Sequence, residues 1–167
     1  FKNNLVDMGI SKDKIGITTT IVDAKKYYEE PRLIEDQVNI LFSSRIEKDK
    51  GIYHLIYAFY LIRSIMPQSK LFIVGSGSEL ENLSKKIKAL DLEDSVIMAG
   101  YRSGKEKIDY YKKSHIFILP SFQEGLPNVF CEALASGLPF ISTPVGGLAD
   151  ALKDGKQGYV INSMPPN

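Results

Sequence analysis

Two glutamates separated by seven residues are the strongest candidates for chemistry in this sequence. Glu124 follows the apolar run from His115 to Leu119, and Glu132 lies in the stretch that begins at Pro127. Beta-branched and aromatic residues bounded by Pro and Ser predict that the run is a buried strand. Proline is favoured as the first residue of a helix, so we expect a helix to begin at Pro127. The strand would carry Glu124 to its carboxyl end, and the helix would carry Glu132.

These predicted positions suit a ligand that bears hydroxyls and an anion. Ligands of open parallel sheets bind beyond the carboxyl ends of the strands. The N–H groups of Gly125, Leu126 and Asn128 would lie at the start of the helix, where anions and polar oxygens are attracted. Glu132, off the apolar face of the helix, could accept hydrogen bonds from a ribose diol. The spacing alone favours the alternative, a loop charge at Glu124 and a solvated helix position at Glu132.

Two cations follow the first confidently predicted strand, Val38 to Ser44. Lys50 lies at the start of a predicted helix, where the macrodipole disfavours a cation by a few tenths to ~1 kcal/mol. Arg45 lies at the strand end nearby. Such a pair is explained if an anion binds between the two side chains. A solvated charged loop is the alternative, because acidic residues such as Glu47 and Asp49 surround them.

The sequence around Arg45, Lys50, Glu124 and Glu132 strongly resembles the C-terminal domain of family 4 retaining glycosyltransferases, the group 1 branch of the GT-B fold. The two glutamates match the E-x7-E motif of that family, and Arg45 and Lys50 match its R-x4-K pair. The resemblance runs from about Val38 to about Ile161. The segments that carry it are Pro120-Ser121-x-x-Glu124-Gly125-Leu126-Pro127, Glu132-Ala133-x-Ala135-x-Gly137-x-Pro139 and Thr143-Pro144-Val145-Gly146-Gly147.

The resemblance implies a set of catalytic and donor-binding residues. Arg45 and Lys50 would bind the donor diphosphate, and Glu124 would hold the sugar hydroxyls or support the positive charge that develops on the sugar. Tyr101 could stack on the base, and Glu132 would bind the ribose. The donor-binding set is Gly75, Gly77, Tyr101, Gly125, Leu126, Pro127, Asn128 and Glu132. Gly75 and Gly77 permit close backbone approach to a ligand, although they also fit an ordinary turn between a strand and a helix.

Strands that alternate with helices predict an α/β fold with a doubly wound, Rossmann-like parallel sheet. By resemblance it is the C-terminal half of a GT-B fold. Residues 1–35 are expected to be a lead-in segment between domains, with a strand from Ile15 to Val22. Residues 36–162 would form the nucleotide-sugar-binding domain, and 163–167 a truncated tail.

Two predicted helices have faces that allow more than one interpretation. The helix from Ile52 to Met66 has a tyrosine-rich apolar face, which we expect to pack on the sheet; a partner or membrane surface is the alternative. The helix from Lys105 to Ser114 is basic. We expect its lysines to face solvent rather than nucleic acid.

Composition excludes several classes of protein. The net charge is +1 over 167 residues, so no global field favours nucleic acid or an acidic membrane. The single cysteine, Cys131, cannot form an internal disulfide, and with only two histidines a zinc site is improbable. No apolar run approaches the roughly 18 residues that a membrane span needs. We expect a cytoplasmic protein, with peripheral contact at the inner face of the membrane only in the full-length enzyme.

The implied reaction is retaining transfer of a sugar from a nucleoside diphosphate, UDP by default, to an acceptor hydroxyl in glycan, polysaccharide or glycolipid synthesis. The resemblance implies no required metal or other cofactor. The acceptor site would belong mainly to an N-terminal domain absent from these residues, so this chain is expected to bind nucleotide without turnover. A sugar-nucleotide 2-epimerase-like GT-B domain is one alternative. A non-catalytic regulatory module is another, but it needs an aspartate where the first strand ends in Ser43, Ser44 and Arg45.

Overall fold

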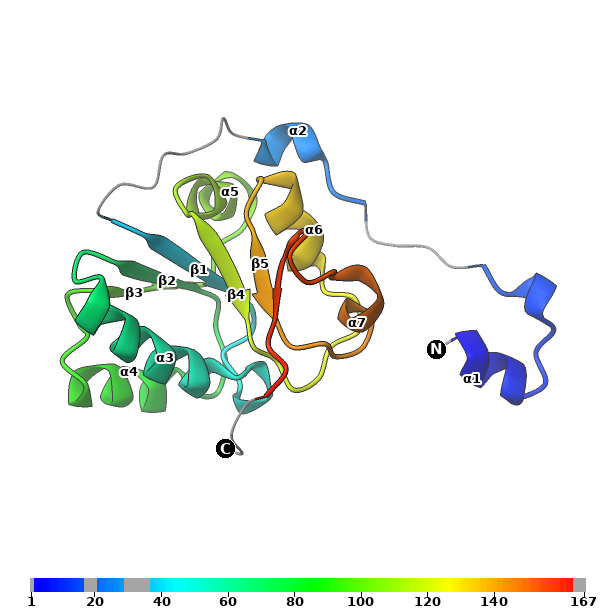
Figure 1. Ribbon diagram of the computed structural model, residues 1–167, viewed down its shortest axis with the longest axis horizontal. Helices are drawn as coiled ribbons and strands as arrows, with labels where there is room; N and C mark the ends of the chain where they lie inside the picture. The colour runs from blue at the N-terminus through cyan, green and yellow to red at the C-terminus, as the bar shows by residue number, and fades with distance from the viewer. Residues whose placement is uncertain (1, 17–20, 29–36, 164–167) are drawn as a thin grey trace.

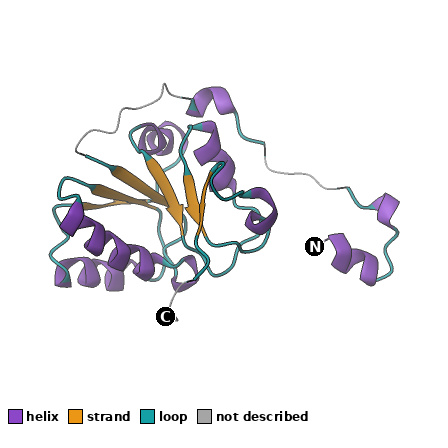
Figure 2. Cartoon of the chain, in the orientation of Figure 1, coloured by secondary structure: helices purple, strands orange, loops and turns teal. Residues whose placement is uncertain are grey.

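A computed structural model describes residues 2–16, 21–28 and 37–163 of the chain. In these ranges six strands form one parallel sheet in the order β3-β2-β1-β4-β5-β6 (Figure 1, Figure 2). The strands are β1 (Asn39–Ser43), β2 (Lys70–Val74), β3 (Val96–Gly100), β4 (Ile116–Leu119), β5 (Phe140–Ser142) and β6 (Gly158–Val160). The predicted α/β fold is therefore confirmed.

Helices cover the sheet from both sides. Figure 1 shows α3 and α4 side by side on one face, and α5 and α6 on the other. The helices after β1 are η2 (Lys48–Lys50), α3 (Ile52–Ile65), α4 (Leu80–Ala89), α5 (Gly104–Lys112), α6 (Asn128–Ala135) and α7 (Leu148–Ala151). The chain order reverses at β1, which makes the sheet doubly wound. In such sheets the ligand-binding crevice lies at the switch point, here between the carboxyl ends of β1 and β4.

The core is aromatic on the face that α5 and α6 cover. Tyr111 from α5 stacks on Phe117 from β4 with ring centroids 5.6 Å apart, and Phe117 stacks on Phe140 from β5 at 5.0 Å. Phe130 from α6 meets Phe140 edge-on, also at 5.0 Å. All four rings are buried. This packing fixes α5 and α6 against the centre of the sheet and therefore fixes the polar groups that these helices carry.

Helix α6 begins one residue later than predicted. Pro127 has extended ψ at 137°, and its carbonyl accepts the N–H of Phe130 at 3.0 Å, so it caps the helix from outside. The predicted C-terminal cap is confirmed. Gly137 has φ +68°, its N–H donates to Leu134, and the N–H of Leu138 donates to Ala133 at 2.9 Å. The helix thus presents a fixed amino end to the crevice.

The N-terminal part of the chain contains α1 (Lys2–Asp7), η1 (Lys12–Lys14) and α2 (Ala24–Tyr27). Helix α2 packs against α5 and α6. Half of the predicted strand from Ile15 to Val22, residues 17–20, lies outside the described residues, and 15–16 and 21–22 are not in a strand. Residues 29–36 of the lead-in and 164–167 of the predicted tail also lie outside them. Among the described helices, none has the length and apolarity needed to cross a bilayer.

Candidate functional site

A buried ion pair lies at the crevice between β1 and β4. The Lys50 ammonium is 3.0 Å from Oε1 of Glu124, 3.1 Å from the carbonyl oxygen of Gln123 and 3.3 Å from the carboxylate of Asp49. The Lys50 and Glu124 side chains are 8% and 11% exposed. The ammonium has three protons and donates hydrogen bonds to Glu124 and Gln123, while Asp49 adds an ion pair. Ser121 Oγ also donates to Glu124, at 2.8 Å.

Two glycines hold the Glu124 loop in place from the turn that follows β5. A Cβ on Gly146 would lie 1.8 Å from the carbonyl oxygen of Glu124, so only glycine lets the two backbones approach this closely. The N–H of Gly147 donates to the carbonyl of Gly125 at 2.7 Å. Thr143 donates from its hydroxyl to the carbonyl of Ser121. The Thr143–Gly147 motif therefore positions Glu124.

Glu132 lies in a second polar cluster, between α5 and α6. Nζ of Lys107 is 2.8 Å and 2.6 Å from its two carboxylate oxygens, and the Tyr111 hydroxyl donates to Oε2 at 2.6 Å. The Tyr27 hydroxyl, from α2, donates to the same carboxylate. The Glu132 side chain is 11% exposed. Glu132 is therefore not a solvated helix position.

Lys107 corrects the expectation that the lysines of this helix face solvent. Its side chain is 22% exposed and makes an ion pair with Glu132. Lys107 and Tyr111 are four residues apart on α5, so they share one face of that helix. This spacing was visible in the sequence, but nothing in it indicated that Glu132, 25 residues away, would meet that face.

Both tyrosines of this cluster keep their protons. Burial, followed by the charge of Glu132 and its hydrogen bond, raises the pKa of Tyr27 to about 12. Burial and then the Glu132 charge raise the pKa of Tyr111 well above its usual value. The two rings meet edge-on with centroids 5.5 Å apart. Both phenols are therefore neutral donors to Glu132 over the whole physiological range.

Alkaline pH should remove the stabilising effect of Tyr27. The folded-state pKa is about 12, above the unfolded value of 10.0, so the contribution is complete below pH 10 and is lost as pH rises through 12. We expect Tyr27→Phe to lower Tm at pH 8 by roughly 2–4 °C, or about 1 kcal/mol, because a buried acceptor loses a donor. This deficit should narrow between pH 10 and 12. Tyr159→Phe is the control, because Tyr159 is 62% exposed. A difference in Tm between the native chain and Tyr27→Phe that does not change with pH would contradict this prediction.

Arg45 is exposed on the loop that follows β1. Gly75 and Gly77 pack against this loop, because a Cβ on either would lie 1.9 Å from the carbonyl oxygen of Ser44 or 2.2 Å from that of Ile46. The N–H of Ile46 donates to the carbonyl of Ser76 at 2.9 Å. In this structure the two glycines therefore shape the Arg45 loop, and their contact with a donor stays a prediction.

Glu47 and Ser78 connect the Arg45 loop to the turn before α4. The hydroxyl and the N–H of Ser78 donate to the Glu47 carboxylate, at 2.6 Å and 3.0 Å. These two hydrogen bonds, with a smaller effect of the Arg45 charge, lower the pKa of Glu47. Glu47 therefore holds the loop as an anion, and the guanidinium of Arg45 extends toward solvent from a fixed backbone.

The other predicted donor-binding residues lie in three places. Gly125 to Asn128 lead into α6, directly after Glu124, and Gly125 and Asn128 are exposed. Glu132 lies about one helical turn further along α6. Tyr101 follows β3 and is 69% exposed, and β2 separates its strand from β1. The structure thus brings Lys50, Glu124 and the start of α6 together, with Glu132 deeper and Tyr101 at the periphery.

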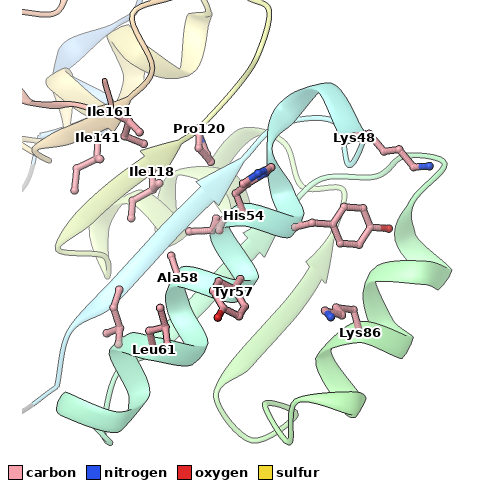
Figure 3. A pocket seen from close by; sticks show the side chains of 13 residues that line it. Lys48, His54, Tyr57, Ala58, Leu61, Lys86, Ile118, Pro120, Ile141 and Ile161 are labelled. Atoms are coloured by element: carbon pink, nitrogen blue, oxygen red, sulfur yellow. The ribbon is translucent and has the colours of Figure 1, made fainter. Parts of the chain in front are cut away.

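An apolar groove of about 900 Å³ lies elsewhere, along α3 (Figure 3). Helix α3 packs on the sheet through one face, with Ile52, Ile56 and Phe59 fully buried. The expectation that its tyrosines share this face is wrong for Tyr57 and Tyr60, which are 58% and 44% exposed. The other side of α3 contributes Tyr57 and Leu61 to the groove. Ile118, Ile141 and Ile161 line the opposite side. None of the predicted catalytic or donor-binding residues lines this groove.

Comparison with known proteins places the chain in a family. Residues 23–165 match the family model of glycosyl transferases group 1, and the chain belongs to that family. Its fold is that of a GT-B glycosyltransferase domain. The apo form of the lipopolysaccharide outer core galactosyltransferase WaaB superposes with a TM-score of 0.77 at 26% identity, over 96% of this chain and 45% of that chain.

Two further relatives have named activities. The chain is 31% identical to the capsular polysaccharide biosynthesis glycosyltransferase CapM of Staphylococcus aureus, over 92% of this chain and 39% of CapM. The pneumococcal O-GlcNAc transferase GtfA, solved with UDP and GlcNAc, matches with a TM-score of 0.68 and 29% identity, over 75% of this chain and 24% of that chain. The chain thus spans less than half the length of each of these relatives.

Proposed function

We propose that this chain is the donor-binding domain of a family 4 retaining glycosyltransferase and binds a UDP-sugar in the crevice between β1 and β4. The observation that carries the proposal is the buried Lys50–Glu124 pair, which lies at the switch point of the sheet beside the amino end of α6. Ligands of doubly wound sheets bind at this point. UDP is the favoured nucleotide because the related GtfA was solved with UDP.

The diphosphate would bind to Lys50, Arg45 and the first N–H groups of α6. The leaving group gains negative charge as the bond to the sugar breaks, and fixed cations aimed at that charge stabilise the transition state. The Lys50 ammonium is held in place by Glu124, the Gln123 carbonyl and Asp49. Phosphate oxygens would replace the weaker of these acceptors, and the exposed Arg45 would add a bidentate contact.

Glu124 would act at the sugar and Glu132 at the ribose. Glu124 is anchored by Lys50 and Ser121 through the same oxygen, Oε1, which leaves Oε2 for a hydroxyl or for the positive charge that develops on the sugar. Glu132 lies deeper, between α5 and α6, where a diol could reach its carboxylate. The two glutamates would thus serve different parts of one donor.

We propose that the transfer retains the anomeric configuration without a covalent enzyme intermediate. The leaving phosphate would help deprotonate the acceptor hydroxyl on the same face of the sugar. Lys50 and Arg45 would supply the positive charge that a metal supplies in other transferases. The acceptor is proposed to bind mainly to an N-terminal domain of the same protein, for polysaccharide or glycolipid synthesis, so this chain alone would bind nucleotide without transferring sugar.

Calorimetric titration of the chain with UDP, GDP and ADP tests this proposal. We expect UDP to bind most tightly, and Glu124→Gln and Glu132→Gln to leave the fold intact, as judged by circular dichroism. With UDP-glucose the chain should bind but release no free glucose. Equal affinity for the three nucleotides would contradict the choice of UDP. No binding of any of them at millimolar concentration would contradict the proposed site.

A further inference from the structure

The ammonium of Lys107 lies against both carboxylate oxygens of Glu132, at 2.8 Å and 2.6 Å. We infer that Lys107 competes with the ribose for Glu132 and that a ribonucleotide must displace it to bind. Lys107 would then determine how strongly this site distinguishes ribonucleotides from deoxyribonucleotides. The inference rests on the proposed role of Glu132 in donor binding.

Most of the hydrogen-bonding capacity of Glu132 is already used. A carboxylate offers about four acceptor positions on its two oxygens. Lys107 contacts both oxygens, at 2.8 Å and 2.6 Å, Tyr111 donates to Oε2 at 2.6 Å, and Tyr27 donates to the same group. A diol that binds in a bidentate manner needs two of these positions. At least one present donor must therefore leave.

Lys107 is the donor best able to leave. Tyr111 is completely buried and stacked on Phe117, so its hydroxyl cannot move away. Tyr27 is held by its edge contact with the Tyr111 ring. The Lys107 side chain is 22% exposed on a flexible four-carbon stem. Among the described residues its other contact is with the Tyr111 ring, whose centroid is 5.8 Å from Nζ.

The position of Lys107 along α5 puts it on the side from which a nucleotide would enter. Helix α5 leads from the carboxyl end of β3 back to the amino end of β4, so its first turns lie at the carboxyl edge of the sheet. Lys107 precedes Tyr111 by four residues, which is about 6 Å along the helix. Lys107 therefore lies between Tyr111 and the edge where the crevice opens, and it covers Glu132 from that side.

The exchange has a measurable consequence for nucleotide selectivity. When UDP binds, the hydrogen bonds of the ribose diol to Glu132 contribute favourable binding free energy. The loss of the ion pair between Lys107 and Glu132 offsets this contribution. A 2′-deoxyribose can make only part of this contact, so it gains less from displacing Lys107. The native chain should therefore prefer UDP over 2′-deoxy-UDP only weakly, and the preference should grow when the ammonium is removed.

Titration of the native chain and its Lys107 variants with UDP and 2′-deoxy-UDP tests this inference. For Lys107→Met we expect UDP to bind about tenfold more tightly. The ribose diol would still form hydrogen bonds to the charged Glu132, and no Lys107 ion pair would have to break first. The affinity for 2′-deoxy-UDP should change much less, so the ratio of the two affinities rises. Lys105→Met is the matched control, since Lys105 is an exposed lysine on the same helix, and both affinities should stay unchanged.

Lys107→Arg provides a second variant that preserves the buried charge pair and should fold. A guanidinium binds a carboxylate through two parallel hydrogen bonds and is harder to displace. We therefore expect this variant to bind UDP several-fold more weakly than the native chain. A purely structural lysine would instead be replaced by arginine without loss.

The outcomes separate the inference from the proposed function. Weaker UDP binding in Lys107→Met would show that the ammonium itself binds the nucleotide, and an unchanged affinity ratio would show that it does not compete; either result overturns the inference while the donor site stands. If neither the native chain nor Lys107→Met binds UDP, the proposed function itself fails, and the inference with it.

Discussion

Lys50→Met is expected to weaken UDP binding to this chain by about 10- to 100-fold, because hydrogen bonds to a charged group contribute about 1.5–3 kcal/mol each. In the complete enzyme, sugar transfer should fall by roughly 100- to 1000-fold, the usual cost of losing one preorganised donor to a developing anion. Isothermal titration with UDP measures the first effect, and a transfer assay on the full-length protein measures the second.

The same substitution also breaks a buried ion pair, so stability must be measured separately. Loss of Lys50 leaves Glu124 as a carboxylate that is 11% exposed and has no cation beside it. Such a break costs about 3–5 kcal/mol. The double variant Lys50→Met/Glu124→Gln removes both charges and should regain most of this stability. If it also regains UDP affinity, the role of Lys50 is structural and the diphosphate assignment is wrong.

Gly51→Ala should disrupt the site without changing any residue that would touch the donor. Gly51 joins η2 to α3 with φ +66°, and a Cβ there would lie 1.9 Å from the carbonyl oxygen of Pro120. The left-handed conformation costs a non-glycine residue about 1–2 kcal/mol, and overpacking adds about 1–3 kcal/mol. We expect the free energy of unfolding, measured in a urea or thermal melt, to fall by roughly 2–5 kcal/mol. The fraction that remains folded should no longer bind UDP.

Gly51→Ala should affect UDP binding because Gly51 lies between the two loops that carry Lys50 and Glu124. Lys50 precedes it, and Pro120 begins the segment that leads to Glu124. The two loops are also joined by a hydrogen bond from the N–H of Phe122 to the carbonyl of Asp49, at 2.8 Å. Gly155→Ala is the control, because Gly155 has φ +73° with no atom within 4 Å of a Cβ. Equal losses in the two variants would show that backbone strain alone, and not the contact with Pro120, is responsible.

The sequence was sufficient to predict the parts of this fold that depend on local patterns. The apolar run before Glu124 became β4, and Gly137 caps α6 as its position predicted. The alternation of strands and helices predicted the doubly wound sheet. These features depend on periodicity and on turn chemistry, which a few neighbouring residues determine.

The contacts made by the site residues could not be predicted in the same way. Glu132 meets Lys107, 25 residues away, and Tyr27 from a helix that precedes the whole sheet. Gly75 and Gly77 pack on a neighbouring loop. Each of these depends on how separate elements pack together, and no local pattern encodes that packing.

Amide chemical shifts measured during a UDP titration would show whether the nucleotide binds at the crevice between β1 and β4. The largest shifts should fall on residues 44–51, on 124–129 and on the part of α5 around Lys107. Residues that line the apolar groove along α3, such as Tyr57 and Leu61, should shift little. Shifts concentrated in that groove, with residues 44–51 and 124–129 unchanged, would show that UDP does not bind at the crevice between β1 and β4.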